Sequence, residues 1–342
     1  MFKRVASFLI VIGMVFMMVA CGGSSQTPST GTNTPSTGNA PSTGGANSGE
    51  QKETRRIGYG CGPLDNPIVQ EMLQGCENWF LEKGITTTPV SFGDDTSKLR
   101  NLIESLVQAG VSGIVLHASG LRDEMIEPAV EAGVPVVIIS SYLETAVCNL
   151  VQDEFPLGQV CGDYAGQWIR DNLDGKCKYA TNSIEGWIAG VLRMDGMKAG
   201  VAKYAPEAVL VNDSPVNNTE MAMSWAESVM LANPDLKCFV VSGDGIAIGV
   251  VEALIAGGYD MSDMGVFCVD ATEQGLQYIK DGTALRMSVS LSGGRVLGAL
   301  AAENLFLAME GGTPEKNIPV PTTPVDINNV EEMAEFLGYN LK

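Results

Sequence analysis

Histidine is the scarcest side chain in this 342-residue chain, which carries only His117. A single imidazole leaves little room for histidine-based acid–base catalysis or for a metal site with several histidine ligands. The sequence also lacks G-x-G-x-x-G after its first predicted strand, G-x-x-x-x-G-K-[ST] and G-x-S-x-G. We therefore predict no enzymatic activity, no cofactor, no metal site and no direct functional role for His117.

Positive charge is also scarce, because 21 Lys and Arg residues face 40 Asp and Glu residues and the net charge is −19. Affinity for nucleic acid comes mainly from cationic side chains that neutralise phosphates, and no long basic run is present. This balance excludes nucleic acid as a partner. It does not indicate a cationic ligand, since solubility explains acidity equally well.

A long apolar run occurs only near the N-terminus, from Val5 to Val19, behind Lys3 and Arg4. It is shorter than the roughly 20 residues of a membrane-spanning helix, and it is typical of an export signal. Met18-Val19-Ala20-Cys21 resembles the lipobox of bacterial lipoproteins. The resemblance implies a signal peptide at residues 1–20 and a diacylglycerol on Cys21, which would anchor the chain to the outer face of the cell membrane. The alternative is an ordinary secretory signal followed by a chance cysteine.

Residues 21–53 consist almost wholly of Ser, Thr, Pro, Gly and Asn. Such a composition cannot bury a core, so we predict a disordered linker. It serves either as a flexible tether for the domain that follows or as a passive cell-wall spacer.

Seven cysteines remain beside Cys21, an odd number without C-x-x-C spacing. Five of them lie in or beside strand-like runs, where a free thiol behaves as a small hydrophobic group. We predict mostly buried thiols, with room for one disulfide.

From Arg55 onward, short β-rich runs alternate with helical patterns. The predicted strands are Arg56–Cys61, Thr87–Phe92, Ser112–His117, Pro135–Ser140, Val147–Val151, Lys178–Asn182, Ala208–Val211, Lys237–Ser242, Gly265–Asp270 and Leu285–Ser290. The predicted helices are 67–83, 97–109, 122–132, 155–172, 190–204, 219–232, 245–257, 272–281 and 293–310. The strands are almost continuously apolar, which indicates a parallel sheet covered by helices on both faces. Ten βα units are too many for one open sheet, so we predict an α/β protein with two doubly wound parallel-sheet lobes. In such sheets ligands bind at the carboxyl ends of the strands.

Several short motifs together resemble the ribose/galactose-type substrate-binding proteins of ABC sugar importers. They are Asp65-Asn66-Pro67, Ala132–Val137, Gly158–Tyr164, Arg193–Met197, Ser242–Gly249 and Cys268-Val269-Asp270. The resemblance runs from Arg55 to Lys342 and implies the type I periplasmic-binding-protein fold, with a small polar ligand, most simply a sugar, delivered to an ABC permease by a monomer. Lactose-repressor-type regulators share this fold, but they carry a helix-turn-helix where this chain has its signal sequence.

The same resemblance implies an N-terminal lobe at 54–153 plus 292–320 and a C-terminal lobe at 154–291 plus 321–342. The chain would cross between the lobes at three hinges, near Asp153, Leu291 and Pro321. Three thin crossings allow the lobes to close around a ligand while each stays rigid.

Four ligand-binding positions carry over from the family's motifs, and each has a structural alternative. Asn66 offers an amide to a hydroxyl, or caps the helix that Pro67 opens. Arg193 offers a fork of donors, or is a surface cation. Asp244 and Asp270 end apolar strands, where a carboxylate needs hydrogen-bond donors. Each of them contacts a ligand or has a structural role. The structural alternative is a helix cap for Asp244 and an inter-lobe salt bridge for Asp270.

The chain also departs from the family's pattern. Ile68 and Val69 stand where aromatic residues usually stack on the sugar, and Gly243 stands where an Asn is usual. Ser140-Ser141 replace an Asp-Arg pair, and neither Ser290 nor Leu291 matches an expected glutamine. We also predict ligand contacts for five further residues, namely Ser140, Ser141, Tyr142, Trp187 and Asn217. For Trp187 the alternative is a buried core residue.

Two other functions are compatible with the sequence. The protein could present its ligand, such as a furanosyl signal molecule of the autoinducer-2 kind, to a sensor kinase or chemoreceptor. It could also be a glycosidase that uses Asp244 and Asp270 as paired carboxylates, although nothing else in the sequence supports a catalytic site.

Overall fold

The computed structural model describes residues 55–93, 95–118, 120–183 and 188–342, so the predicted signal peptide, Cys21, the linker and Trp187 lie outside the described residues. Residues Lys52–Lys342 form one compact unit. Within the described ranges no helix combines the length and the apolar character that crossing a membrane requires.

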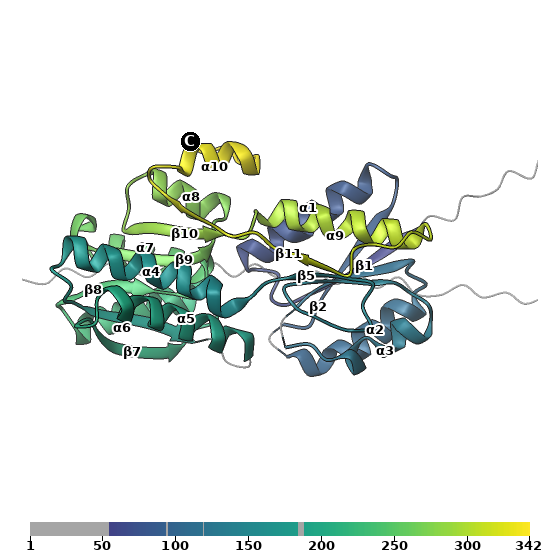
Figure 1. The fold of residues 1–342 in the computed structure, drawn as a ribbon, viewed down its shortest axis with the longest axis horizontal. Helices are drawn as coiled ribbons and strands as arrows, with labels where there is room; N and C mark the ends of the chain where they lie inside the picture. Colours follow the sequence, from purple (N-terminus) through teal and green to yellow (C-terminus); the bar gives the residue numbers. More distant parts are fainter. Residues whose placement is uncertain (1–54, 94, 119, 184–187) are drawn as a thin grey trace, which may run out of the picture. The chain divides into compact units, whose positions relative to one another are not determined.

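The first sheet has six parallel strands in the order β11-β5-β4-β3-β1-β2. Figure 1 labels β11, β5, β1 and β2 of this sheet. Its strands are β1 (Arg56–Cys61), β2 (Thr86–Ser91), β3 (Gly113–His117), β4 (Val136–Ile139), β5 (Cys148–Val151) and β11 (Asn317–Pro319). Its helices are α1 (Pro67–Leu81), α2 (Leu99–Gln108), α3 (Glu127–Glu131) and α9 (Gly294–Met309).

Side chains alternate between two buried faces of this sheet, as expected for a sheet covered by helices on both sides. Val115 and Val137 pack in one core with residues of α1 and α9. Ile114 and Val136 pack in a second core with residues of α2 and α3. The continuous apolar runs in the sequence thus serve two cores at once.

The second sheet also has six strands, in the order β12-β10-β9-β8-β6-β7, and only β12 is antiparallel to its neighbour. Its strands are β6 (Lys178–Ser183), β7 (Val209–Pro215), β8 (Leu236–Val240), β9 (Gly265–Asp270), β10 (Leu285–Ser290) and β12 (Thr323–Asp326). Its helices are α4 (Glu154–Asn172), α5 (Ile188–Tyr204), α6 (Thr219–Ala232), α7 (Asp244–Ala256), α8 (Glu273–Lys280) and α10 (Val330–Leu337). The architecture of two parallel-sheet α/β lobes is therefore confirmed.

The chain passes from one sheet to the other after β5, after β10 and between β11 and β12. All ten predicted strands are present, whereas β11, β12 and α10 were not predicted as elements. A polar contact also joins elements of the two sheets: the carboxylate of Glu71 on α1 accepts from the Glu273 N–H at the start of α8, at 3.1 Å, and from the Tyr339 hydroxyl.

Several helix pairs, α4 with α5 and α1 with α9 among them, pack so closely that only glycine fits at the contact. An added Cβ at Gly158 of α4 would lie 1.9 Å from the carbonyl oxygen of Arg193 on α5, and one at Gly162 would lie 2.0 Å from that of Met197. The same relation joins α1 and α9, where a Cβ at Gly298 would lie 1.9 Å from the Met72 oxygen. Close approach of α4 to α5 matters for function because it fixes the position of Arg193.

All seven cysteines in the described part of the chain are free thiols, and all except the half-buried Cys177 are buried. Burial raises the pKa of the Cys61, Cys148 and Cys177 thiols to about 11. The prediction of buried thiols is borne out, and no disulfide forms between the described cysteines.

Candidate functional site

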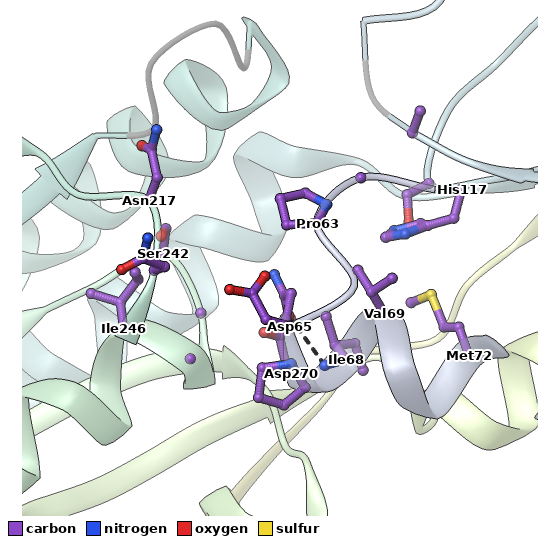
Figure 2. Close-up of a pocket in the computed structure, with 18 of the residues that line it drawn as sticks. Pro63, Asp65, Ile68, Val69, Met72, His117, Asn217, Ser242, Ile246 and Asp270 are labelled. Atoms are coloured by element: carbon purple, nitrogen blue, oxygen red, sulfur yellow. Dashed lines mark hydrogen bonds between the residues drawn. The ribbon is translucent and has the colours of Figure 1, made fainter. Parts of the chain in front are cut away.

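A cavity of about 450 Å³ opens at the carboxyl ends of the strands of both sheets. Its wall consists of Gly62, Pro63, Asp65–Val69, Met72, Phe92, Gly93, Thr96, His117, Ala118, Ser140, Gln152, Glu154, Arg193, Asn217–Glu220, Ser242, Gly243, Gly245, Ile246, Asp270 and Leu291. Figure 2 shows Asn217 and Ser242 on one side of this space and His117 and Met72 on the other. Strand-end positions and a volume of this order are typical of small-molecule sites in α/β proteins.

An ion pair between Arg193 and Glu154 is buried in the cavity wall. Arg193 Nε and Nη2 donate to the two carboxylate oxygens of Glu154 at 2.7 and 3.2 Å, and Arg193 Nη1 donates to the Ser242 carbonyl at 2.7 Å. Burial alone would lower the pKa of Arg193, but the charge and hydrogen bonds of Glu154 raise it above its usual value. Arg193 is therefore a fixed cation held in place by partners on both sides, and the alternative of a surface cation is wrong.

Asp270 also lines the cavity and is 6% exposed. Its Oδ2 accepts from the Asp244 N–H at the first turn of α7 at 3.2 Å, where the helix dipole favours negative charge. Burial, and next the charge of Asp244, raise the pKa of Asp270 well above its usual range. Its φ of 112° is unusual for a residue with a side chain, and such strain is concentrated at functional sites.

Gly243 explains how Asp270 reaches this place. A Cβ at residue 243 would lie 2.7 Å from Oδ2 of Asp270, which is closer than such atoms approach. The glycine that stands where the resemblance leads one to expect an Asn thus makes room for the carboxylate. The departure noted in the sequence is a local adaptation of the site.

Asp244 lies behind the cavity wall and is not among the residues that line it. Its fully buried carboxylate accepts from Ser288 Oγ at 2.6 Å, Cys268 Sγ at 3.0 Å, and the N–H and hydroxyl of Thr272 at 2.7 and 2.8 Å. Burial raises the pKa of Asp244, and these hydrogen bonds lower it in part. Four donors saturate the carboxylate, so the structure assigns it to joining α7, α8 and β10. The ligand contact predicted for it has no support in this geometry.

The other predicted positions divide between the cavity and the surface. Asn66 lines the cavity while its side chain caps α1 by accepting from the Ile68 N–H at 3.2 Å. Ser140 and Asn217 also line the cavity, and Ser140 has a φ of 67°. In contrast, Ser141 is not part of the wall, and Tyr142 is 49% exposed and bonded to Glu144.

His117 and Gln152 are cavity residues that the sequence analysis did not select. The buried Nδ1 of His117 and Nε2 of Gln152 have no hydrogen-bond partner within the described part of the chain. Burial, and next the charge of Arg193, lower the pKa of His117 to about 4. His117 ends β3 and Gln152 follows β5, so the strand-end rule was the signal that could have identified both.

Apart from Phe92, aliphatic side chains form most of the apolar part of the wall. Ile68, Val69 and Met72 come from α1, and Ile246 and Leu291 come from the second sheet's side. These residues offer CH groups to a ligand without a flat aromatic face. Among the described residues no group of three or more His, Cys, Asp or Glu side chains is placed to hold a metal ion.

Comparisons with known proteins agree with this geometry. A family model described as a periplasmic binding protein domain matches residues 57–313. The ribose import binding protein of Bacillus subtilis is 27% identical over 280 residues, which cover 81% of this chain and 88% of that protein. A D-apiose import binding protein of Actinobacillus succinogenes is 27% identical over 207 residues, which cover 57% of this chain and 63% of that protein.

Solved structures share the fold over most of the chain. An ABC transporter solute-binding protein of Bacillus halodurans with bound myo-inositol matches with a TM-score of 0.70 and 18% identity, covering 83% of this chain and 98% of that one. A carbohydrate transporter solute-binding protein of Agrobacterium radiobacter with D-arabinose matches with a TM-score of 0.74 and 16% identity, covering 84% and 99%.

Proposed function

The chain belongs to the periplasmic binding protein family, and on that premise we propose that it captures a small sugar or related polyol in the cavity between its two sheets and delivers it to an ABC permease. The observation that carries the proposal is the cavity itself, which joins fixed hydrogen-bonding groups to an aliphatic wall. The names of the relatives, which include ribose and D-apiose import binding proteins, point to the same ligand class.

Binding without chemistry fits the composition of the site. A glycosidase would need Asp244 and Asp270 as a pair of carboxylates in the cavity. Asp270 lines the cavity, but Asp244 lies behind the wall and accepts hydrogen bonds from Ser288 and Thr272. An unchanged ligand recovered after long incubation is the expected result, and a hydrolysed glycoside would contradict it.

Closure of the lobes is the expected response to the ligand. A ligand that contacts Arg193 or Asp270 on one side and Asn66 or Ser140 on the other favours the closed arrangement by its differential affinity. We assign 54–153 plus 292–320 to the N-terminal lobe and 154–291 plus 321–342 to the C-terminal lobe. A decrease in the radius of gyration by small-angle scattering on saturation with ligand tests this movement.

The direct test is calorimetry with the chain from Lys52 onward, which forms a compact unit by itself. The panel contains ribose, allose, arabinose, apiose and myo-inositol. One member is expected to bind, and Arg193→Ala is expected to weaken that binding at least tenfold, whereas Arg170→Ala on the exposed surface is not. If no sugar or polyol of any charge binds at millimolar concentration, the proposed function is wrong.

Anchoring belongs to the same proposal. A lipid on Cys21 would keep the binding domain near its permease, and two acyl chains suffice for stable attachment. Labelling of cells with an alkyne fatty acid should mark the native chain and leave Cys21→Ala unmarked. Equal labelling of both would show that Cys21 is not the site. For the soluble domain we expect a monomer by light scattering.

A further inference from the structure

Two buried nitrogen atoms on the first-sheet side of the cavity lack partners. Nδ1 of His117 and Nε2 of Gln152 are both buried, both residues line the cavity, and neither atom has a hydrogen-bond partner in the described ranges. Buried polar groups are nearly always paired, and leaving one unpaired costs about 1–3 kcal/mol. Since both residues line the cavity, a ligand that fills it is a candidate partner for these two atoms.

The neighbouring polar groups of the first sheet are less available. The side-chain oxygen of Asn66 already accepts from the Ile68 N–H. Ser140 supplies only a small hydroxyl where the resemblance leads one to expect a charged pair. His117 and Gln152 project from the ends of β3 and β5, on either side of the β4 strand that Ser140 follows. They therefore flank the strand end at which the expected charged pair is absent.

The charges around the cavity restrict the ligand further. Arg193 is the one cation among the described residues that line it, and its guanidinium already binds Glu154 and the Ser242 carbonyl. Four acidic residues line the same space: Asp65, Glu154, Glu220 and Asp270. An anionic group would meet these carboxyl groups, and among the described lining residues the single cation is already paired, so its desolvation would be uncompensated.

We propose that His117 and Gln152 are specificity-determining residues that bind hydroxyl groups of a neutral polyol or sugar and that the cavity rejects sugars bearing a carboxylate or a phosphate. The amide of Gln152 donates to a ligand oxygen. The neutral imidazole of His117 either donates to or accepts from a hydroxyl at Nδ1, according to its tautomer. This inference rests on the proposed function and adds to it the chemical class of the ligand.

Calorimetry tests the selection. Neutral sugars and polyols are compared with gluconate, glucuronate and ribose 5-phosphate in wild type, His117→Leu, Gln152→Leu and the conservative His117→Asn. Each Leu variant is expected to bind the neutral ligand about five- to tenfold more weakly, the loss of one hydrogen bond. His117→Asn should recover part of the affinity. Thr87→Val is the matched control, since Thr87 has a buried unpartnered hydroxyl outside the cavity wall.

A measurement on the wild-type protein does not depend on any variant folding. Because the chain has a single histidine, the imidazole ¹⁵N spectrum reports only His117. Saturation with the neutral ligand is expected to shift the Nδ1 resonance. An unchanged resonance, or Leu variants that bind as wild type does, would overturn the assignment of these residues.

The two proposals fail in different ways. If wild type binds a sugar acid or sugar phosphate more tightly than any neutral compound, the inference is wrong while sugar capture stands. If wild type binds no sugar or polyol of any charge, both the proposed function and this inference are wrong.

Discussion

Arg193 of α5 and Glu154 of α4 form a bidentate ion pair in the cavity wall, with both side chains less than a tenth exposed. The pair joins α4, which follows the first crossing, to α5, which carries Arg193 into the cavity wall. Buried pairs of this kind stabilise little overall, but removing one partner is costly because the other charge remains buried.

Replacing Glu154 by Gln is therefore expected to lower the free energy of unfolding by about 3 kcal/mol. The loss arises from the uncompensated charge of Arg193, and urea denaturation measures it. Asp171→Asn is the control, because its ion pair with Arg170 is exposed and should contribute less than about 1 kcal/mol. Equal stabilities of the two variants would contradict the buried-pair interpretation.

Asp244 and Asp270 should respond oppositely to substitution by Asn. Asp244→Asn puts an amide where four donors converge, so we expect a loss of about 2 kcal/mol or more in stability. Asp270→Asn should keep most of the stability and weaken ligand binding about tenfold, because Asp270 faces the cavity. Thermal denaturation and calorimetry on both variants separate the two roles. A stable, non-binding Asp244→Asn would reverse the assignment.

Substitution of Gly158 by Ala tests whether helix packing positions Arg193. The added Cβ would lie 1.9 Å from the backbone oxygen of Arg193, so α5 must shift. We expect a loss of about 1–3 kcal/mol in stability and weaker ligand binding. Gly166→Ala on the same helix has its nearest contact at 3.0 Å and should cost clearly less. The same loss in both variants would exclude the close approach as the cause.

The pKa of His117 predicts how acid affects folding. Its folded-state value of about 4 lies below the ordinary 6.5, so between these limits the unfolded chain takes up a proton that the folded protein does not. Its contribution to stability is therefore present above about pH 6.5 and is lost as the pH falls toward 4, by up to about 1.4 kcal/mol per pH unit.

Buried carboxyls with raised pKa values, Glu71, Asp244 and Asp270, act in the opposite direction on acidification. The difference between wild type and His117→Gln isolates the histidine. The variant should gain stability relative to wild type as the pH decreases through this window, as measured by denaturation without ligand. Parallel curves for the two proteins would show that His117 is not held neutral.

The sequence was sufficient for most of the fold because its main strands are buried on both faces. β3 and β4 are short and almost continuously apolar, and this pattern identifies each as a buried strand. In contrast, β11 and β12 are only three and four residues long, lie at sheet edges and each contain a proline. Their existence depends on neighbours from distant parts of the chain, which a local pattern does not reveal.

The site was harder to predict because each strand-end polar residue had two plausible roles. Asp244 and Asp270 both follow apolar runs in the sequence. In the structure Thr272 and Ser288 donate hydrogen bonds to Asp244, whereas Asp270 lies in the cavity wall. His117 was set aside because one histidine suggested no catalysis. A scarcity of histidine bears on acid–base catalysis and on metal binding, whereas a single imidazole is sufficient to bind a ligand.

The position of β11 has a consequence for how the chain folds. Asn149 of β5 donates its side-chain amide to Asn317 of β11, a residue 168 positions further along the chain, at 3.1 Å. The first sheet therefore stays unfinished until the whole second sheet except β12 has been synthesised. Contacts between such distant residues make folding slow. A chain whose two sheets are each completed by a strand near its C-terminus is expected to reach its native state only after most of it has been synthesised.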